Sequence, residues 1–157
     1  MKLFGIFLFA LGALLFTARV SAGERKKGKR IEGVYLLFLH MRHAICKEGL
    51  PLSEVYARFA NQALEEEGFL PALRAEGLSA ALKKHPPPIS DAALGALFLY
   101  AEGLGKRFLE EEANALESAC ERLVGELDGF RLALPSRLKI YRTLLLSGSG
   151  MLLLLFV

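Results

Sequence analysis

Apolar side chains recur along most of this chain at intervals of three and four residues, the spacing of one face of an α-helix. The first such stripe predicts a helix over residues 29–47, and Gly49 followed by Pro51 should end that helix and begin the next. The members of this stripe are Ile31, Val34, Phe38, Met41 and Ile45.

A second stripe predicts a helix over residues 51–66, which Gly68 should end. Pro71 and Gly77 divide the next segment, residues 69–84, into two short helical pieces. The members of the second stripe are Leu52, Val55, Tyr56, Phe59, Ala63 and Leu64.

Three consecutive prolines in residues 85–88 form a rigid break, and Ser90 is a suitable N-cap for a helix over residues 91–103. The longest periodic pattern then predicts a final helix with a coiled-coil-like seam. Pro135 should kink or briefly interrupt this helix, because proline removes a backbone hydrogen bond and clashes with the preceding turn. The seam consists of Leu109, Ala113, Leu116, Cys120, Leu123, Leu127, Phe130 and Leu134.

Two uncharged apolar runs lie at the ends of the chain, at residues 3–18 and 143–157. A helix rises about 1.5 Å per residue and the hydrocarbon layer is about 30 Å thick, so each run falls short of a full span. The long side chains of Arg19 and Arg142 extend the runs by reaching the membrane surface. We therefore expect transmembrane helices at residues 1–23 and 143–157.

Charge predicts the orientation of these helices. Only Lys2 and the terminal amine precede the first run, whereas basic residues are dense after it and just before the second run. The positive-inside rule then places residues 24–142 in the cytoplasm and both ends of the chain outside. With 53% hydrophobic residues in a chain of 157, the composition also suits a membrane protein. The predicted architecture is all-α: a small helical bundle flanked by N- and C-terminal transmembrane helices.

Two alternatives concern the N-terminal segment. Val20, Ser21 and Ala22 before Gly23 satisfy the small-residue rule of a signal-peptide cleavage site, which would make the chain an exported helical protein with a C-terminal membrane anchor. The basic run at residues 24–30 could bind nucleic acid, but it has no interleaved aromatic residues. Attraction to anionic lipid headgroups explains that run better, so we expect no nucleic-acid partner.

Candidate chemistry is scarce. His40, His43 and Cys46 resemble a zinc ligand set, but positions i and i+6 of a helix are rotated apart by about a third of a turn, and a fourth ligand is missing. Cys46 and Cys120 should stay reduced in a cytoplasmic domain. The acids at residues 110–112 point to different faces of a helix, so they cannot form a catalytic pair. The helix dipole favours acidic residues near the N-terminus in any case. We expect no enzyme, no metal site and no cofactor, because the phosphate-binding, nucleophile-elbow and metalloprotease motifs do not occur.

The order of segments resembles the stage III sporulation protein AB family. Leu50, Pro51, Leu52 and Glu54, after Ile45, match the motif in which the extended first helix turns into an acidic second helix. The Leu-Gly before the last long helix is matched by Leu104 and Gly105, and the closing Gly-Leu pattern by Gly150 and the leucines after it.

This resemblance implies a non-enzymatic component of the channel complex that connects mother cell and forespore. Its domain would be similar to the helical domains of the platform protein of type II secretion and type IV pilus systems. A cytoplasmic ATPase is the implied partner, together with other proteins of the complex, and the implied location is the mother-cell membrane facing the forespore. In such an adaptor the Leu50–Glu54 motif and the Leu-Gly pair should face a partner.

Small residues in the two apolar runs predict close helix packing in the membrane. Thr143 and Ser147 are one helical turn apart, so another helix can approach closely there. We expect the two spans to pack on each other, or on neighbouring copies, through these surfaces. They comprise Gly12, Ala13 and Thr17 in the first run, and Thr143, Ser147, Gly148 and Gly150 in the second.

Overall fold

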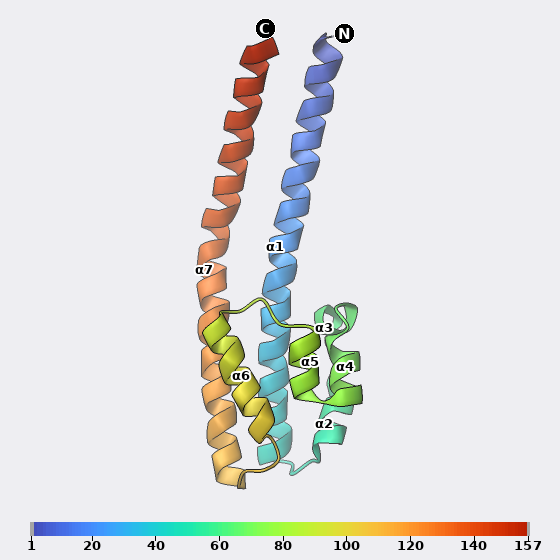
Figure 1. Ribbon diagram of the computed structural model, residues 1–157, viewed down its shortest axis with the longest axis vertical. Coiled ribbons are helices and arrows are strands. Elements are labelled where there is room, and N and C mark those ends of the chain that lie inside the picture. The colour runs from blue at the N-terminus through green and yellow to red at the C-terminus, as the bar shows by residue number, and fades with distance from the viewer. Residues whose placement is uncertain (1, 157) are drawn as a thin grey trace. The chain divides into compact units, whose positions relative to one another are not determined.

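The computed structural model describes residues 2–156, with side chains at residue 12, residues 15–141 and residue 143. Within residues 2–156 every regular element is a helix (Figure 1), which confirms the predicted all-α class. The helices are α1 (Lys2–Cys46), α2 (Leu52–Arg58), α3 (Gln62–Glu66), α4 (Phe69–Glu76), α5 (Leu78–Lys84), α6 (Asp91–Gly103) and α7 (Leu109–Phe156).

The first helix is longer than the expected bundle helix of residues 29–47. It runs without a break from Lys2 to Cys46, because no proline occurs before Pro51 and a helix tolerates its isolated glycines. The predicted apolar stripe is confirmed: Ile31, Val34 and Phe38 are all buried, as is Met41.

The predicted turn after α1 is also confirmed. Gly49 adopts the left-handed conformation with φ 64°, which costs a side-chain-bearing residue energy that glycine avoids. The amide of Leu50 donates a hydrogen bond to the Ala44 carbonyl at 3.0 Å, so the last turn of α1 keeps a partner. Pro51 is the N-cap of α2.

The prediction of one helix over residues 51–66 is wrong, because this segment divides into α2 and α3. The Asn61 side chain accepts a hydrogen bond from the Leu64 amide at 3.2 Å and so caps a new helix. Arg74 of α4 satisfies the end of α2 by donating to the carbonyls of Tyr56 at 3.5 Å and Phe59 at 2.9 Å. These hydrogen bonds from Arg74, a residue distant in sequence, stabilise the early end of α2.

The predictions for Gly68, Gly77 and Ser90 are confirmed. Gly68 and Gly77 have φ values of 81° and 89°, and they end α3 and separate α4 from α5. The amide of Ala93 donates to the Ser90 hydroxyl at 3.3 Å, so Ser90 caps α6 as expected. Ser90 also donates from its amide to Glu126 of α7 at 3.1 Å, which ties the start of α6 to the last helix.

The seam on α7 is confirmed in its middle part only. Leu116, Cys120 and Leu123 are buried with Leu127, whereas Leu109 at the start is exposed. The expected break at Pro135 is absent, since α7 continues as a helix through the proline. Pro135 is exposed, so water can bind the carbonyl group that loses its amide partner.

The chain forms two compact units. Lys27–Gly129 make a helical bundle around one apolar core, to which α1 to α7 all contribute. This bundle is shorter than the domain of residues 24–142 expected from charge. The other unit contains α1 up to Lys26 and α7 from Phe130 onward. In the described part of the chain, no helix is both long and apolar enough to cross a membrane.

Gly33 allows α3 to lie directly against α1. A Cβ atom at this position would stand 2.9 Å from Asn61 Oδ1 and 2.9 Å from Leu64 Cγ. Neither neighbour can move freely, because Asn61 caps α3 and Leu64 is fully buried. The close approach of α1 and α3 therefore requires a residue without a side chain.

We expect Gly33→Ala to lower the free energy of unfolding by about 1–2 kcal/mol, because overpacking outweighs the gain in helix propensity. Gly125→Ala is the matched control, since a Cβ on this α7 glycine meets nothing within 4 Å. That variant should be more stable by about 0.5–1 kcal/mol. Urea unfolding of the purified chain, followed by circular dichroism, measures both, and equal effects of the two substitutions would contradict the close contact.

Candidate partner-binding site

Two turns that are far apart in the sequence meet at one end of the bundle. They are the α1–α2 turn and the α6–α7 turn (Figure 1), and we call them together, residues 47–54 and 104–109, the corner. Leu52 Cδ1 lies 3.8 Å from the position that a Cβ on Gly105 would take. The corner thus brings together the two motifs expected to face a partner, Leu50-Pro51-Leu52 with Glu54, and Leu104-Gly105.

Most apolar members of these motifs serve the bundle itself. Leu50, Leu52 and Leu104 are partly buried and pack against the core cluster. Gly105 has φ 77°, so the α6–α7 turn uses the left-handed conformation at that residue. Pro51 and Gly105 are the exposed members of the two motifs. The motifs mainly shape the corner, and little of their own surface is left for a partner.

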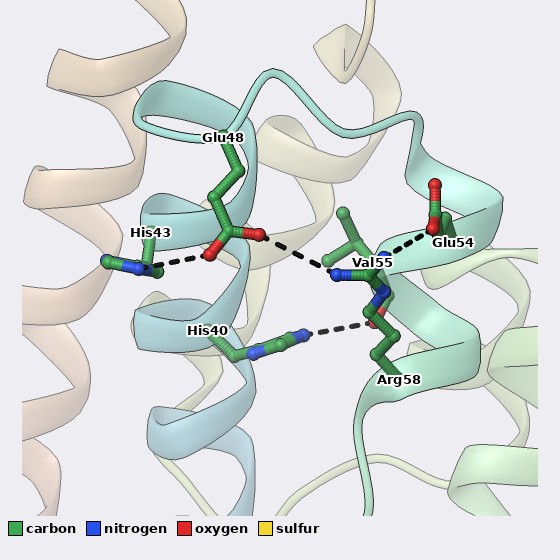
Figure 2. Close-up of polar contacts among 6 residues, drawn as sticks. All are labelled: His40, His43, Glu48, Glu54, Val55 and Arg58. Carbon is green, nitrogen blue, oxygen red and sulfur yellow. Dashed lines mark hydrogen bonds and ion pairs between the residues drawn. The ribbon is translucent and has the colours of Figure 1, made fainter.

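Charged side chains link α1 to α2 across the corner (Figure 2). Glu48 lies 3.2 Å from His43 Nε2 and 3.8 Å from Arg58 Nη1, and Arg58 Nη2 donates to Glu54 Oε1 at 2.6 Å. These groups are well exposed, so each ion pair contributes little to stability. Glu54 of the expected partner motif is therefore already engaged by an arginine of its own helix.

The two histidines of α1, His40 and His43, make separate contacts. His40 Nε2 donates to the Val55 carbonyl at 3.2 Å (Figure 2), and its ring packs on Phe59 with a centroid distance of 5.5 Å. His43 instead pairs with Glu48. The structure does not bring His40, His43 and Cys46 to one point. Among the side chains that the structure describes, no group of three His, Cys, Asp or Glu residues is arranged to hold a metal ion.

Sequence reasoning missed a buried polar cluster behind the α6–α7 turn. Glu112 is only 5% exposed, and it accepts a hydrogen bond from the Tyr100 hydroxyl at 2.5 Å. Arg107 Nη1 lies 3.8 Å from Glu112 Oε2, and its guanidinium stands 5.5 Å from the centre of the Tyr100 ring. Glu110 and Glu111 are exposed, as expected for acids that only favour a helix start.

The positions of this pair could have been noticed in the sequence. Phe108 accepts the first α7 hydrogen bond, from the Glu112 amide at 2.8 Å, so Phe108 occupies the N-cap position. Arg107 and Glu112 then occupy N′ and N4, where two apolar side chains often pack and fix the entry of the chain into a helix. An ion pair replaces that apolar contact here. The burial of Glu112 depends on Tyr100 of α6, and the sequence of α7 alone does not show that Tyr100 lies there.

Burial and the charge of Glu112 change the acidity of two tyrosines. Burial is the larger cause at Tyr56, where it raises the pKa from 10.0 to about 12, and the Glu112 carboxylate adds to the effect. Burial also raises the pKa of Tyr100, with a further contribution from its hydrogen bond to Glu112. Both hydroxyls are therefore held neutral under ordinary conditions.

Both cysteines are free thiols, with Cys46 half-buried and Cys120 buried. Burial raises the pKa of the Cys120 thiol, so this side chain acts as a small apolar residue in the core rather than as a nucleophile.

The expected membrane-packing surfaces are described only in part. Gly12 is exposed and Thr17 is half-buried. Thr143 is exposed, and its hydroxyl donates to the Lys139 carbonyl of the same helix at 3.0 Å. The side chains of Ala13 and Ser147, and the surroundings of Gly148 and Gly150, lie outside the described residues.

One ion pair joins the two long helices within their shared unit. Arg137 Nη1 of α7 lies 3.6 Å from Glu24 Oε2 of α1, and Glu24 is 7% exposed. The Arg137 guanidinium also stands 5.9 Å from the centre of the Phe130 ring. Glu24 lies six residues after the first apolar run, and Arg137 lies six residues before the second.

The structure defines an all-helical protein, with a bundle of residues 27–129 and a second helical unit made of the N-terminal part of α1 and the C-terminal part of α7. Comparison with known proteins adds no family, because no family model, curated protein or solved structure matches the chain.

We expect Tyr100→Phe and Glu112→Leu each to lower the free energy of unfolding by about 1–3 kcal/mol, because each leaves a buried polar partner unsatisfied. The double variant should lose less stability than the sum of the two single losses, by about 1 kcal/mol. The reason is that both substitutions break the same hydrogen bond, so each single loss already includes it. A double-mutant cycle from urea unfolding measures this coupling. Strict additivity of the two losses would show that the hydrogen bond does not form.

Alkaline pH should destabilise the bundle. Tyr56 has a pKa near 10 when unfolded and about 12 when folded. The unfolded state therefore releases its proton first, and stability that is complete below pH 10 is lost as pH rises toward 12. Tyr56→Phe should flatten this decline, while the decline due to Tyr100 remains. Unfolding free energies measured between pH 9 and 11.5 test this, and parallel curves for the two proteins would contradict it.

Proposed function

We propose that this chain is a two-pass membrane adaptor, without catalytic activity of its own, that presents its helical bundle to a cytoplasmic ATPase. The complex would be the secretion-like channel of sporulation, between mother cell and forespore, which the resemblance to the stage III sporulation protein AB family implies. The transmembrane helices at residues 1–23 and 143–157 are part of this proposal.

The observation that carries the proposal is the ion pair between Glu24 and Arg137. It joins α1 to α7 at positions six residues from each apolar run. A buried carboxylate is costly unless a cation compensates it, so the pair favours an arrangement in which both helices enter the membrane side by side.

The basic residues around this pair support the same topology. Arg25, Lys26 and Lys27 follow Glu24, and Lys139 and Arg142 follow Arg137. Such clusters attract anionic headgroups of the cytoplasmic leaflet. Two apolar helices with basic residues at the end of each run that adjoins the bundle sequence would hold the bundle on the cytoplasmic side.

The polar groups of the bundle also suit a scaffold. The Tyr100–Glu112 hydrogen bond joins α6 to α7, and Arg42 of α1 donates to Glu117 of α7 at 3.0 Å. The first contact joins consecutive helices, and the second joins α1 to α7, which are distant in sequence. A bundle braced in this way offers a partner a defined surface, which is what an adaptor requires.

We expect a single cysteine at position 66 to be inaccessible from outside the cell. The variant is Glu66→Cys in a chain with Cys46→Ala and Cys120→Ala, since Glu66 is exposed on α3. A membrane-impermeant maleimide should label it only after permeabilisation, whereas tags at both ends of the chain should react in intact cells.

Affinity purification from membranes of the source organism should recover an ATPase with the chain.

The exported alternative predicts the opposite pattern. Position 66 would then be labelled in intact cells, and the mature protein would begin at Gly23 on N-terminal sequencing. Recovery of the chain as a lone monomer would count against the adaptor function even if the topology is correct.

A further inference from the structure

Two adjacent apolar side chains stand in solvent at the corner. Phe108 is 83% exposed and Leu109 is 58% exposed. Single exposed apolar residues are common on protein surfaces, but a neighbouring phenylalanine and leucine at a turn form a patch of the kind that binds other proteins. Leu109 was expected to begin the buried seam of α7, so its exposure is a departure from the helical pattern.

The Phe108 side chain does not make the capping hydrogen bond that a residue at its position can make. It is the N-cap residue of α7, where Ser, Thr, Asp or Asn would accept a hydrogen bond from the first turn and stabilise the helix. A phenylalanine ring cannot accept that bond, and this ring is not covered by the rest of the described bundle. Local stability therefore does not explain why an aromatic residue is present.

The buried cluster holds this patch in place. Arg107 directly precedes Phe108, and its guanidinium fills the space that a side chain on Gly103 would occupy. On its other side it faces Glu112, one turn into α7. With the residues at N′ and N4 anchored inward, the N-cap residue between them is directed outward. The patch is thus presented by a rigid support, which lowers the entropy cost of binding.

The exposed charged residues of the chain segment that carries the patch are mainly acidic. The exposed charged residues between positions 102 and 111 are Glu102, Lys106, Glu110 and Glu111. Arg107 does not offset them at the surface, because its charge is directed toward Glu112. Three carboxylates therefore face solvent against one ammonium group, and electrostatic complementarity favours a basic partner.

We propose that Phe108 and Leu109, bordered by Glu110 and Glu111, form the contact surface for a partner protein that offers an apolar recess lined with lysine or arginine. This inference rests on the proposed function as an adaptor, and it assigns the docking to the start of α7. The Leu104-Gly105 turn leads into this surface, and Leu52 lies beside Gly105.

The test is site-specific crosslinking of the full chain in membranes of the source organism. A photoreactive phenylalanine derivative replaces Leu109, and the control replaces Leu99 of α6, which is 70% exposed. Position 109 should give a crosslink to one partner protein that position 99 does not give. The Glu110→Lys/Glu111→Lys double substitution should lower its yield at least tenfold, and reversing the basic residues nearest the crosslinked peptide of the partner should restore it.

Phe108→Ser separates binding from folding. Serine is a good N-cap, so this variant should unfold at the same temperature or higher, while its crosslink yield at position 109 falls at least tenfold. A fall in melting temperature together with the lost crosslink would assign Phe108 to the fold and overturn the proposal.

The remaining outcomes are also decisive. A crosslink to a second copy of the chain or to lipid overturns the docking surface. A crosslink yield that does not change in the Glu110→Lys/Glu111→Lys variant also overturns it. If an ATPase co-purifies but never crosslinks to position 109, the surface is wrong and the adaptor function stands. If position 109 crosslinks to a basic partner protein that is not an ATPase, the surface stands and the proposed function fails.

Discussion

The fold depends on the burial of one apolar stripe on α1. Val34, Leu37, Phe38 and Met41 are completely buried, and they belong to the core cluster to which every other helix contributes. The helices α2 to α5 are each shorter than nine residues, and helices of that length are marginal by themselves in water. They exist here because the long helix gives their apolar side chains a surface on which to pack.

The same packing produces the surface that we assign to a partner. The ring of Tyr100 lies 5.4 Å from that of Phe38, so α6 is held against α1 at the residue that binds Glu112. Arg107 Nη1 lies 3.8 Å from Glu112 Oε2, and Phe108 between these two residues is exposed. The core contact of α1 is therefore linked, through Tyr100 and Glu112, to the turn that carries the exposed residues.

The candidate site could be predicted only in part. The Leu50-Pro51-Leu52 and Leu104-Gly105 motifs were recognised from the sequence, and the structure brings them together. The motifs were expected to face a partner, and their leucines are partly buried against the core. Three consecutive glutamates look alike in the sequence, yet only Glu112 is buried. The helical period shows that they face different directions, but it does not show where Tyr100 lies.

The sequence by itself determined the features that depend on near neighbours. These include the all-α class, the helix ends at Gly49 and Gly68, the break at Gly77, the Ser90 cap and the buried face of α1, because propensity, capping and periodicity act within a few residues. The tertiary structure alone decided the division of α2 from α3, the passage of α7 through Pro135 and the burial of Glu112. Each of these depends on a group from elsewhere or on exposure to solvent: Arg74 satisfies the end of α2, water can reach the turn at Pro135, and Tyr100 donates to Glu112.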